Sequence, residues 1–299
     1  MHDVTIIGGS YAGAAAALQL GRARRSVLVV DAGSRRNRFA SHSHGFLGSD
    51  GASPSAIAEK ARAEVLAYPT VRWLEGTVRE ARPIAGGFAV RVGAEDHHSK
   101  RLILATGVAD ELPAVPGLAD RWGNTVFHCP YCHGYELGRG RLGVLGTHAL
   151  GIHHALLVSE WAGERQTTLF LERGIEPEAE ERKLLEARSV RIERTRVIAI
   201  GGEAPAVEVR LEDGRSYALD GLFVTPRTRL SDDLASQLGC ELEAGPAGPF
   251  YKTDATKETT VPGIFACGDA GLAMGTVSFA VADGARAGMA AHRSLVFRS

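Results

Sequence analysis

Cysteine is scarce in this 299-residue sequence, which contains only four, too few for the disulfide framework of a small secreted domain. Long apolar runs are absent, because no stretch reaches the roughly 18–20 residues that a membrane-spanning helix needs. Charge of one sign does not accumulate either, since 34 Lys and Arg oppose 35 Asp and Glu without a long basic run. The sequence therefore predicts neither a nucleic-acid partner nor a membrane partner.

The N-terminus lacks the basic flank and the cleavage site of a signal peptide, and it enters a strand-like run at Val4 to Ile7 at once. We therefore expect a cytoplasmic protein. Its length suits two domains of ordinary size, and 44% hydrophobic residues can fill a core in each. In a cytoplasmic chain, a close pair of cysteines is more often redox-active or metal-binding than structural.

A strand, a glycine turn, a helix and a second strand follow one another twice along the chain. The first set occupies residues 3–7, 8–13, 14–22 and 26–30. The second set occupies residues 141–145, 146–151, 152–161 and 167–171. Parallel strands joined by a helix indicate a doubly wound sheet, so we predict an α/β protein with two Rossmann-like dinucleotide-binding domains.

Two segments rich in loop signals suggest where these domains meet. The first is the proline-rich stretch 112–117, and the second falls near residues 226–233. We therefore predict a discontinuous first domain, residues 1–112 and 234–299. A second domain of the NAD(P) type, residues 113–233, is inserted into it.

The first glycine turn carries the signal of a dinucleotide site. Residues 8–13 read GGSYAG, which keeps Gly8 and Gly13 of the G-x-G-x-x-G fingerprint and puts Ser10 at the second glycine. Such a turn points a helix N-terminus at a pyrophosphate, and a small serine is tolerable there. Asp31 ends the next strand, where it can accept hydrogen bonds from a ribose. An ordinary strand–helix turn is the plain alternative, and the surrounding βαβ context argues against it.

Two further segments point to FAD rather than a nicotinamide, through the family that they resemble. Thr106 and Gly107 close a buried strand, and residues 260–269, TVPGIFACGD, end on Gly268 and Asp269. These segments resemble those of the two-dinucleotide-domain flavoprotein disulfide reductases. The resemblance implies that Asp269 contacts the ribityl chain and that the following helix points its N-terminus at the flavin. The remaining candidate FAD-binding positions are Asn37, Val78, Thr276 and Val277.

Residues 128–133, HCPYCH, contain the C-x-x-C spacing of a redox disulfide in Cys129 and Cys132. Two intervening residues let both sulfurs meet at the first turn of a helix, whose N-terminus lowers a thiol pKa. Half of a zinc site is the alternative, but it would need two more ligands. Cys240 and Cys267 are single and separated, so we predict no metal.

The pair stands immediately before the second βαβ unit, which is the layout of the low-molecular-weight thioredoxin reductases. Nearly the whole chain resembles that family. The resemblance implies that Cys132 faces the flavin, that Cys129 meets the substrate, and that the protein is a homodimer. In that family an acid residue follows the second cysteine. His133 takes its place here and is the candidate general acid/base.

The second glycine turn departs from that family. His148 occupies the second-glycine position, where an imidazole would fill the space that a pyrophosphate needs. Glu172 follows the next strand, where a thioredoxin reductase carries a cationic cluster for the NADPH 2′-phosphate. NADH in an adapted turn is one interpretation. The one that we favour is that the fold persists without its nicotinamide, so NAD(P)H is a doubtful cofactor.

Residues 129–136, CPYCHGYE, and 43–47, SHGFL, also resemble the FAD-dependent dithiol oxidases of gliotoxin and holomycin biosynthesis. That resemblance implies oxidation of a small dithiol, with O2 as the electron acceptor, and it makes His44 a possible catalytic residue. The main alternative is an NAD(P)H-dependent reductase of thioredoxin or another disulfide. Two lesser alternatives are a ferredoxin-linked reductase and a flavin-bound redox sensor without turnover.

Overall fold

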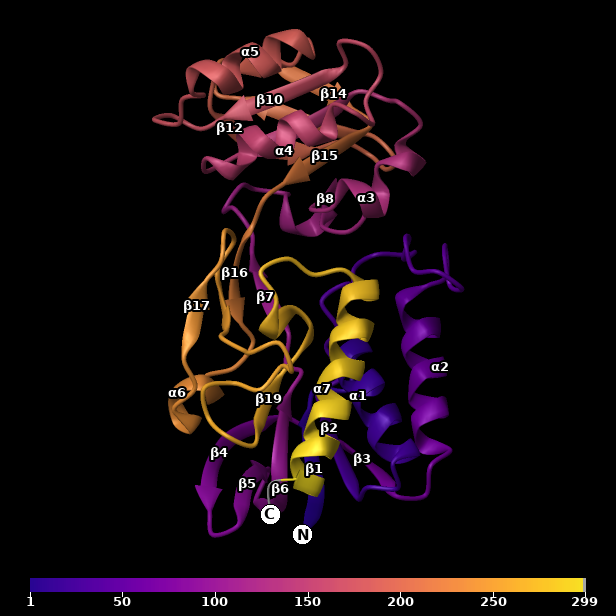
Figure 1. Ribbon diagram of the computed structural model, residues 1–299. Helices are drawn as coiled ribbons and strands as arrows, with labels where there is room; N and C mark the ends of the chain where they lie inside the picture. The colour runs from indigo at the N-terminus through magenta and orange to yellow at the C-terminus, as the bar shows by residue number, and fades with distance from the viewer. Residues whose placement is uncertain (298–299) are drawn as a thin grey trace.

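The computed structural model describes residues 1–297 and contains a mixed sheet and a parallel sheet, joined by a pair of strands (Figure 1). The larger, which we call the N-terminal sheet, has the order β3-β2-β1-β6-β5-β4, with β19 also paired to β6. Its strands are β1 (His2–Ile7), β2 (Val27–Asp31), β3 (Val71–Glu75), β4 (Val78–Ile84), β5 (Gly87–Val92), β6 (Glu95–Leu104) and β19 (Ile264–Ala266). Both ends of the chain therefore contribute to this sheet.

Small residues bring the helices close together beside the N-terminal sheet. Helices α1 (Tyr11–Arg22), α2 (Pro54–Leu66) and α7 (Val277–Phe297) lie side by side in Figure 1. A Cβ on Gly284 of α7 would stand 2.0 Å from the carbonyl oxygen of Ala12 on α1. Only glycine allows this approach, which fixes α7 against the first dinucleotide turn.

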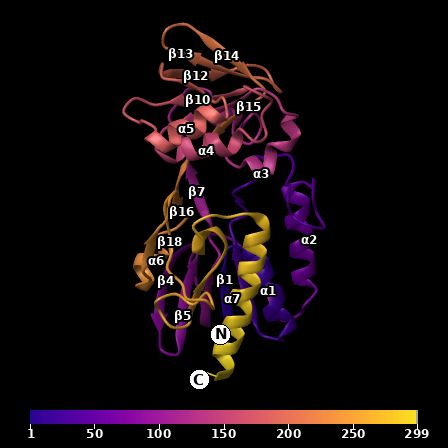
Figure 2. The ribbon, with the colours of Figure 1, turned by 45° about the horizontal axis from the view of Figure 1, so that its top comes forward.

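The second sheet, which we call the central sheet, is parallel throughout, with the order β11-β10-β9-β15-β8. Its strands are β8 (Val126–Phe127), β9 (Leu142–Gly146), β10 (Thr167–Leu171), β11 (Arg191–Glu193) and β15 (Gly221–Val224). Helices α4 (Leu150–Val158) and α5 (Ala179–Ala187) lie beside it. An antiparallel sheet of β12 (Val197–Gly201), β13 (Val207–Leu211) and β14 (Ser216–Leu219) lies at its far side (Figure 2).

Strands β7 (Val108–Glu111) and β16 (Arg227–Leu230) pair antiparallel between the two sheets. Beyond β16, the chain returns to the N-terminal sheet through α6 (Leu234–Leu238), β17 (Leu242–Ala244) and β18 (Pro249–Tyr251). Figure 1 shows the β7–β16 pair running between the upper and lower parts of the molecule. The chain therefore crosses between the parts twice, at one place.

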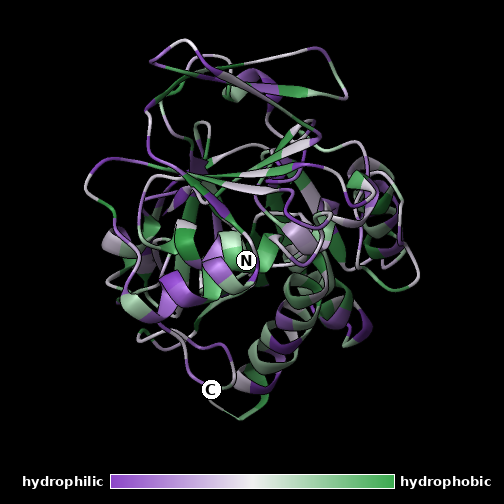
Figure 3. Ribbon diagram, turned by 90° about the horizontal axis from the view of Figure 1, so that it is seen from above, coloured by the Kyte–Doolittle hydropathy of each residue, from purple (hydrophilic) through white to green (hydrophobic). Residues whose placement is uncertain are grey.

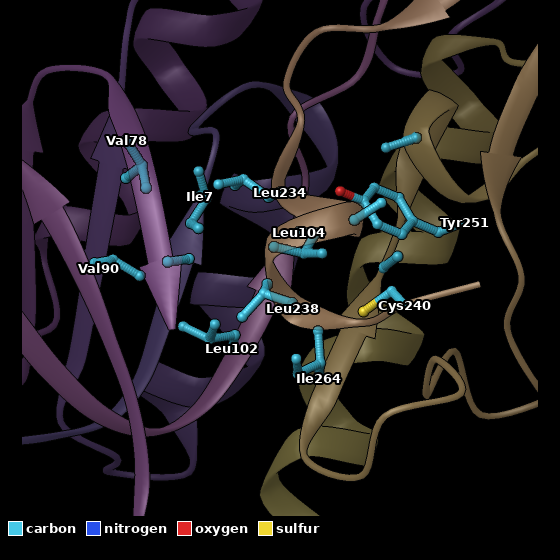
Figure 4. Packing of buried hydrophobic residues seen from close by; sticks show 14 of the residues in the cluster. Ile7, Val78, Val90, Leu102, Leu104, Leu234, Leu238, Cys240, Tyr251 and Ile264 are labelled. Carbon is cyan, nitrogen blue, oxygen red and sulfur yellow. The ribbon is translucent and has the colours of Figure 1, made fainter. Parts of the chain in front are cut away.

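Figure 3 colours the ribbon by residue hydropathy, and green, hydrophobic residues recur along the strands and the helices. One buried cluster joins the N-terminal sheet to the returning segment, and Figure 4 shows its side chains meeting from both. Tyr251 is fully buried there, and its hydroxyl donates to Asp232 at 2.9 Å. Among residues 1–297, no helix is long and apolar enough to cross a membrane.

The predicted α/β fold class is confirmed, and the first helix shows how its boundaries differ. We predicted a turn over residues 8–13, but α1 already begins at Tyr11, with Ser10 as its N-cap. The last residues of the fingerprint therefore belong to the helix itself, which brings its N-terminus to the ligand side of the turn. The second helix likewise begins early, at Leu150, and ends at Val158.

Candidate active site

Cys129 and Cys132 form a disulfide at the start of helix α3 (Pro130–His133). Cys129 is the N-cap in an extended conformation, and Pro130 occupies the first helical position, where its missing N–H costs nothing. The backbone N–H of Cys132 donates to the Cys129 carbonyl at 3.2 Å. The tight turn thus presents both sulfurs on one short segment, as the C-x-x-C spacing predicted.

His133 follows directly and stacks on Phe127, with the ring centroids 4.4 Å apart. Both ring nitrogens are buried and lack a well-formed hydrogen bond among the described residues. Burial lowers the pKa of His133, although the Cys129 backbone and the charge of Glu136 act in the opposite direction. The imidazole is therefore neutral at pH 7, and a neutral imidazole can accept a proton released near the sulfurs.

His44 comes from the other part of the molecule, in the loop between β2 and α2. Its Nε2 lies 3.5 Å from a carboxylate oxygen of Glu136, close in sequence to the disulfide, and its Nδ1 lies 3.6 Å from Asp50. The same loop accepts a hydrogen bond at the Gly45 carbonyl from the Ser278 hydroxyl, on the first turn of α7. The loop therefore touches both the disulfide segment and the start of α7.

His128 and His154 form a stacked pair that no sequence motif indicated. Their rings stack with centroids 5.7 Å apart and an interplanar angle of 12°, although His154 lies on α4. His128 donates from Nδ1 to the Val224 carbonyl at 3.2 Å. Burial, followed by the charge of His128, lowers the pKa of His154 to about 3. The spacing of His154 from buried Gly151 and Val158 is the helical signal that could have placed it inside.

The first glycine turn forms a tight cradle that fits a dinucleotide. A Cβ on Gly8 would stand 2.2 Å from the Ala105 carbonyl oxygen, and one on Gly13 would stand 1.8 Å from the Gly8 oxygen. Ser10 makes no side-chain capping bond, and no acidic residue occupies the first turn of α1. Thr106 Oγ1 is buried beside this turn without a partner. These features suit a bound pyrophosphate, which would meet the helix N-terminus and the free hydroxyl.

The other candidate FAD-binding residues border the same turn or lie further along the cofactor's expected path. Asp31 accepts the Gly9 N–H at 3.1 Å, and Asn37 bonds the Tyr11 hydroxyl at 3.1 Å. Thr276 accepts the Phe279 N–H at 3.1 Å and so orders the start of α7, which begins at Val277.

Three more of these positions rest on backbone features. Gly107 and Gly268 both adopt positive φ, at +68° and +67°. The side chain of Val78 is packed in the core, 6% exposed, so any contact that it made would come from its backbone. Of the three, Gly268 lies against the first helix, because a Cβ on it would stand 2.8 Å from the Ala12 Cβ.

Asp269 lies in a short 3-10 helix (Gly268–Gly271) just before α7. One of its carboxylate oxygens accepts from Arg36 Nη1 at 2.8 Å. The Gly268 N–H donates to buried Asp283 at 3.0 Å, and Asp283 pairs with Lys257 at 3.1 Å. The motif is therefore held in place by ionic contacts on two sides.

The second glycine turn retains the close contact between its outer glycines but carries a histidine at its middle position. A Cβ on Gly151 would stand 2.5 Å from the Gly146 Cα, so the two outer glycines remain in close contact. Between them, His148 donates from Nε2 to the Thr225 carbonyl at 2.7 Å. A cleft of about 1050 Å3 lies beside this turn and is lined by His148, Glu172 and Arg173, among others. The turn fits a dinucleotide pyrophosphate less well than the first turn does, because a hydrogen-bonded histidine stands where the fingerprint has its middle glycine.

Residues 1–297 contain no cluster of three or more His, Cys, Asp or Glu side chains arranged to hold a metal ion. A redox disulfide and an FAD cradle in one α/β chain instead define a flavin-dependent disulfide oxidoreductase.

Comparisons with known proteins give the family. Residues 2–284 match the pyridine nucleotide-disulphide oxidoreductases, and the chain belongs to that family, which uses FAD. It is 34% identical to thioredoxin reductase sirT of Leptosphaeria maculans, over 96% of this chain and 92% of that protein. It is 33% identical to thioredoxin reductase tcpT of Claviceps purpurea, over 98% and 94%. The resemblance to thioredoxin-reductase-like flavoproteins is confirmed.

Among solved structures, an oxidoreductase from Agrobacterium tumefaciens is 54% identical with a TM-score of 0.94, covering 100% of this chain and 99% of that one. The whole length of the chain, and not one domain of it, therefore shares this architecture.

Proposed function

We propose that this chain oxidises a small dithiol to a disulfide through Cys129 and Cys132, with FAD as cofactor and O2 as acceptor. A contrast within the chain carries the proposal. The first turn, the candidate FAD cradle, has only the small Ser10 at its middle position, whereas His148 takes that position in the turn that a nicotinamide dinucleotide would need. One dithiol and one O2 give one disulfide and one H2O2, which balances two electrons and two protons.

The cysteine pair takes the electrons from the substrate in two exchange steps. A substrate thiolate attacks Cys129 Sγ, which breaks the Cys129–Cys132 bond and releases Cys132 as a thiolate. The second substrate thiol, after losing its proton, attacks the sulfur now joined to Cys129. That attack closes the product disulfide and releases Cys129. Bound FAD supplies the acceptor that takes two electrons from the pair and passes them to oxygen.

His133 manages the proton in this scheme. Its ring stacks on Phe127, and burial keeps it neutral at pH 7, so it can accept the proton of the second substrate thiol. His44 contacts Glu136 beside the same segment, and we assign it the weaker role of shaping the field around His133. That assignment agrees with the lowering effect of His44 on the pKa of His133.

An NAD(P)H-dependent reductase of thioredoxin or another disulfide is the second candidate. The sirT and tcpT relatives, both named thioredoxin reductases, favour it, and so does the retained cleft of about 1050 Å3 beside the second turn. In that function the electrons run in reverse, from nicotinamide to the disulfide. Thioredoxin would then be the partner in place of a small dithiol.

Anaerobic mixing separates the two candidates. The purified holoprotein is mixed in turn with NADPH, NADH and dithiothreitol while the flavin absorbance is followed. We expect bleaching by the dithiol alone, and recovery of the flavin with stoichiometric peroxide on admission of air. Rapid bleaching by either nicotinamide would establish the reductase and overturn the oxidase proposal.

A further inference from the structure

Arg36 joins two parts of the molecule that are far apart in sequence. It lies after β2, and its guanidinium bonds Asp110 with two nitrogens, Nε at 3.0 Å and Nη2. Nη1 donates to Asp269 at 2.8 Å. Asp110 lies on β7, one of the two strands between the sheets, and Asp269 lies in the FAD motif. One side chain therefore links the connecting strand to the flavin motif.

The planar guanidinium suits this position better than a lysine ammonium would. It presents donors in a fixed fork, so it can meet one carboxylate with two bonds and another with a third. The contact is also largely shielded, because the side chains of Arg36, Asp110 and Asp269 are 28%, 9% and 20% exposed. Burial alone would lower the pKa of Arg36, but the two carboxylates raise it above its ordinary value.

The link lies close to the disulfide segment. The charges of Arg36, Asp110 and Asp269 all act on the pKa of His128, the residue before Cys129. Asp110 stands opposite Thr228 in the β7–β16 pair, where both crossings of the chain meet. A shift of β7 against Asp269 would therefore move the part of the molecule that carries the disulfide relative to the FAD motif.

A second contact spans the same boundary at another point. His44 and Glu136 lie 3.5 Å apart, one from the loop after β2 and the other from the segment after α3. This pair is more exposed, with 22% and 43% of the side chains accessible, so it holds the boundary less firmly than the Arg36 contacts do. Both contacts favour the same arrangement of the two parts.

We propose that Arg36 is a positioning residue that ties strand β7 to the FAD motif and so holds the disulfide where it exchanges electrons with the flavin. The inference rests on the disulfide–FAD electron route of the proposed function, but not on its direction or on oxygen as acceptor. Arg36 needs no contact with substrate. It acts through Asp110 on one side and Asp269 on the other.

The test uses the FAD-loaded protein and the variants Arg36→Met and Asp110→Asn, singly and together. Arg82→Met is the matched control, because Arg82 also bonds a carboxylate, that of Asp96 at 2.6 Å, but on the surface of the β4–β6 region. Each protein is reduced anaerobically by two electrons, with dithiothreitol and separately with dithionite. The long-wavelength absorbance of a thiolate beside oxidised flavin reports their proximity, and FAD affinity is measured alongside.

Asp110→Asn is the decisive variant, because Asp110 lies on the connecting strand β7 and bonds Arg36 without belonging to the FAD motif. We expect it to keep FAD affinity within about threefold while the long-wavelength absorbance per bound FAD falls severalfold and flavin reduction slows about tenfold. The Arg36→Met/Asp110→Asn double variant should have the same long-wavelength absorbance as Arg36→Met, because both substitutions remove the same Arg36–Asp110 contact. Arg82→Met should match the wild type.

Unchanged absorbance per bound FAD in both Asp110→Asn and Arg36→Met would overturn the proposal, and so would a loss confined to FAD affinity. If Asp110→Asn does not fold, Arg36→Lys replaces it, because a lysine cannot bond both carboxylates in the same way. Arg36→Lys should lose long-wavelength absorbance as Arg36→Met does, and wild-type absorbance in it would again overturn the proposal that Arg36 positions the disulfide. Dithionite reaches the same reduced state without a dithiol, so failure of the dithiol oxidase proposal would be recognised separately.

Discussion

The two glycine turns share a backbone arrangement and differ in what stands at their centre. In the first, Gly13 lies against Gly8 and Ser10 adds only a small side chain. In the second, Gly151 also lies close against Gly146, but the middle position carries His148, whose imidazole bonds the Thr225 carbonyl. The two outer glycines of each turn therefore indicate close packing of the helix on the strand, whereas the residue at the second-glycine position determines whether a pyrophosphate can approach the turn. A fold can keep the first property after it has lost the second.

We expect the largest change in flavin reduction from a substitution in the disulfide that passes electrons to the FAD bound at the first turn. Cys132→Ser removes the sulfur assigned to the flavin, so bleaching by dithiothreitol should slow at least about a thousandfold. Stopped-flow absorbance measures it. Cys240→Ala is the control, because burial raises the pKa of that thiol and it lies in the core, and its bleaching rate should match the wild type. Bleaching that survives Cys132→Ser would remove the proposed electron route.

Adding one methyl group to each turn separates packing from ligand binding. A Cβ on Gly13 would collide with the Gly8 oxygen, so Gly13→Ala should weaken FAD binding about a hundredfold. Gly151→Ala produces a similar collision in the second turn and should lower the thermal stability. FAD affinity should nevertheless be retained in Gly151→Ala. Equal FAD loss in both variants would mean that the turns are not functionally distinct.

Replacing His148 by glycine gives the second turn the middle residue of the fingerprint and should make it resemble the first turn in ligand binding. His148→Gly deletes the imidazole that bonds Thr225, and we expect NADH affinity to rise about tenfold, as measured by calorimetry. His153→Gly on the exposed face of α4 is the control for an added glycine and should bind no better than the wild type. If His148→Gly gains no affinity, the adenosine end of the cleft, near Glu172, limits binding instead. Glu172→Arg in the same background would then raise NADPH affinity.

The two βαβ units could be predicted from local sequence, because the hydrophobic periodicity, the glycines of the turn and the acid that ends the second strand lie within about 30 residues of one another. The disulfide was predictable for the same reason. The contacts that relate these parts were not. Arg36 meets Asp269 across 233 positions, and His44 meets Glu136 from another loop. A single charged side chain carries no periodic signal, so its partner is decided only when the sheets are packed together.

His154 sharpens the comparison between the helices that follow the two turns. The buried face of α1 consists of Ala, Gly and Leu, whereas α4 buries His154 against the ring of His128. Burial lowers the pKa of His154 to about 3 from an ordinary 6.5. The unfolded chain therefore binds a proton below pH 6.5 that the native chain does not bind. The stability contribution of the neutral imidazole is complete above pH 6.5 and is lost as the pH falls toward 3.

His154→Gln removes this titration while keeping a polar side chain. Between pH 6.5 and 5, the free energy of unfolding should fall about 1–2 kcal/mol less in the variant than in the wild type. Urea unfolding with excess FAD at the two pH values measures the difference. His153→Gln, one position away on the exposed face, should keep the wild-type slope. Identical slopes in all three proteins would show that His154 takes up its proton alike in the native and unfolded states, and the contrast between the two helices would then lie in packing alone.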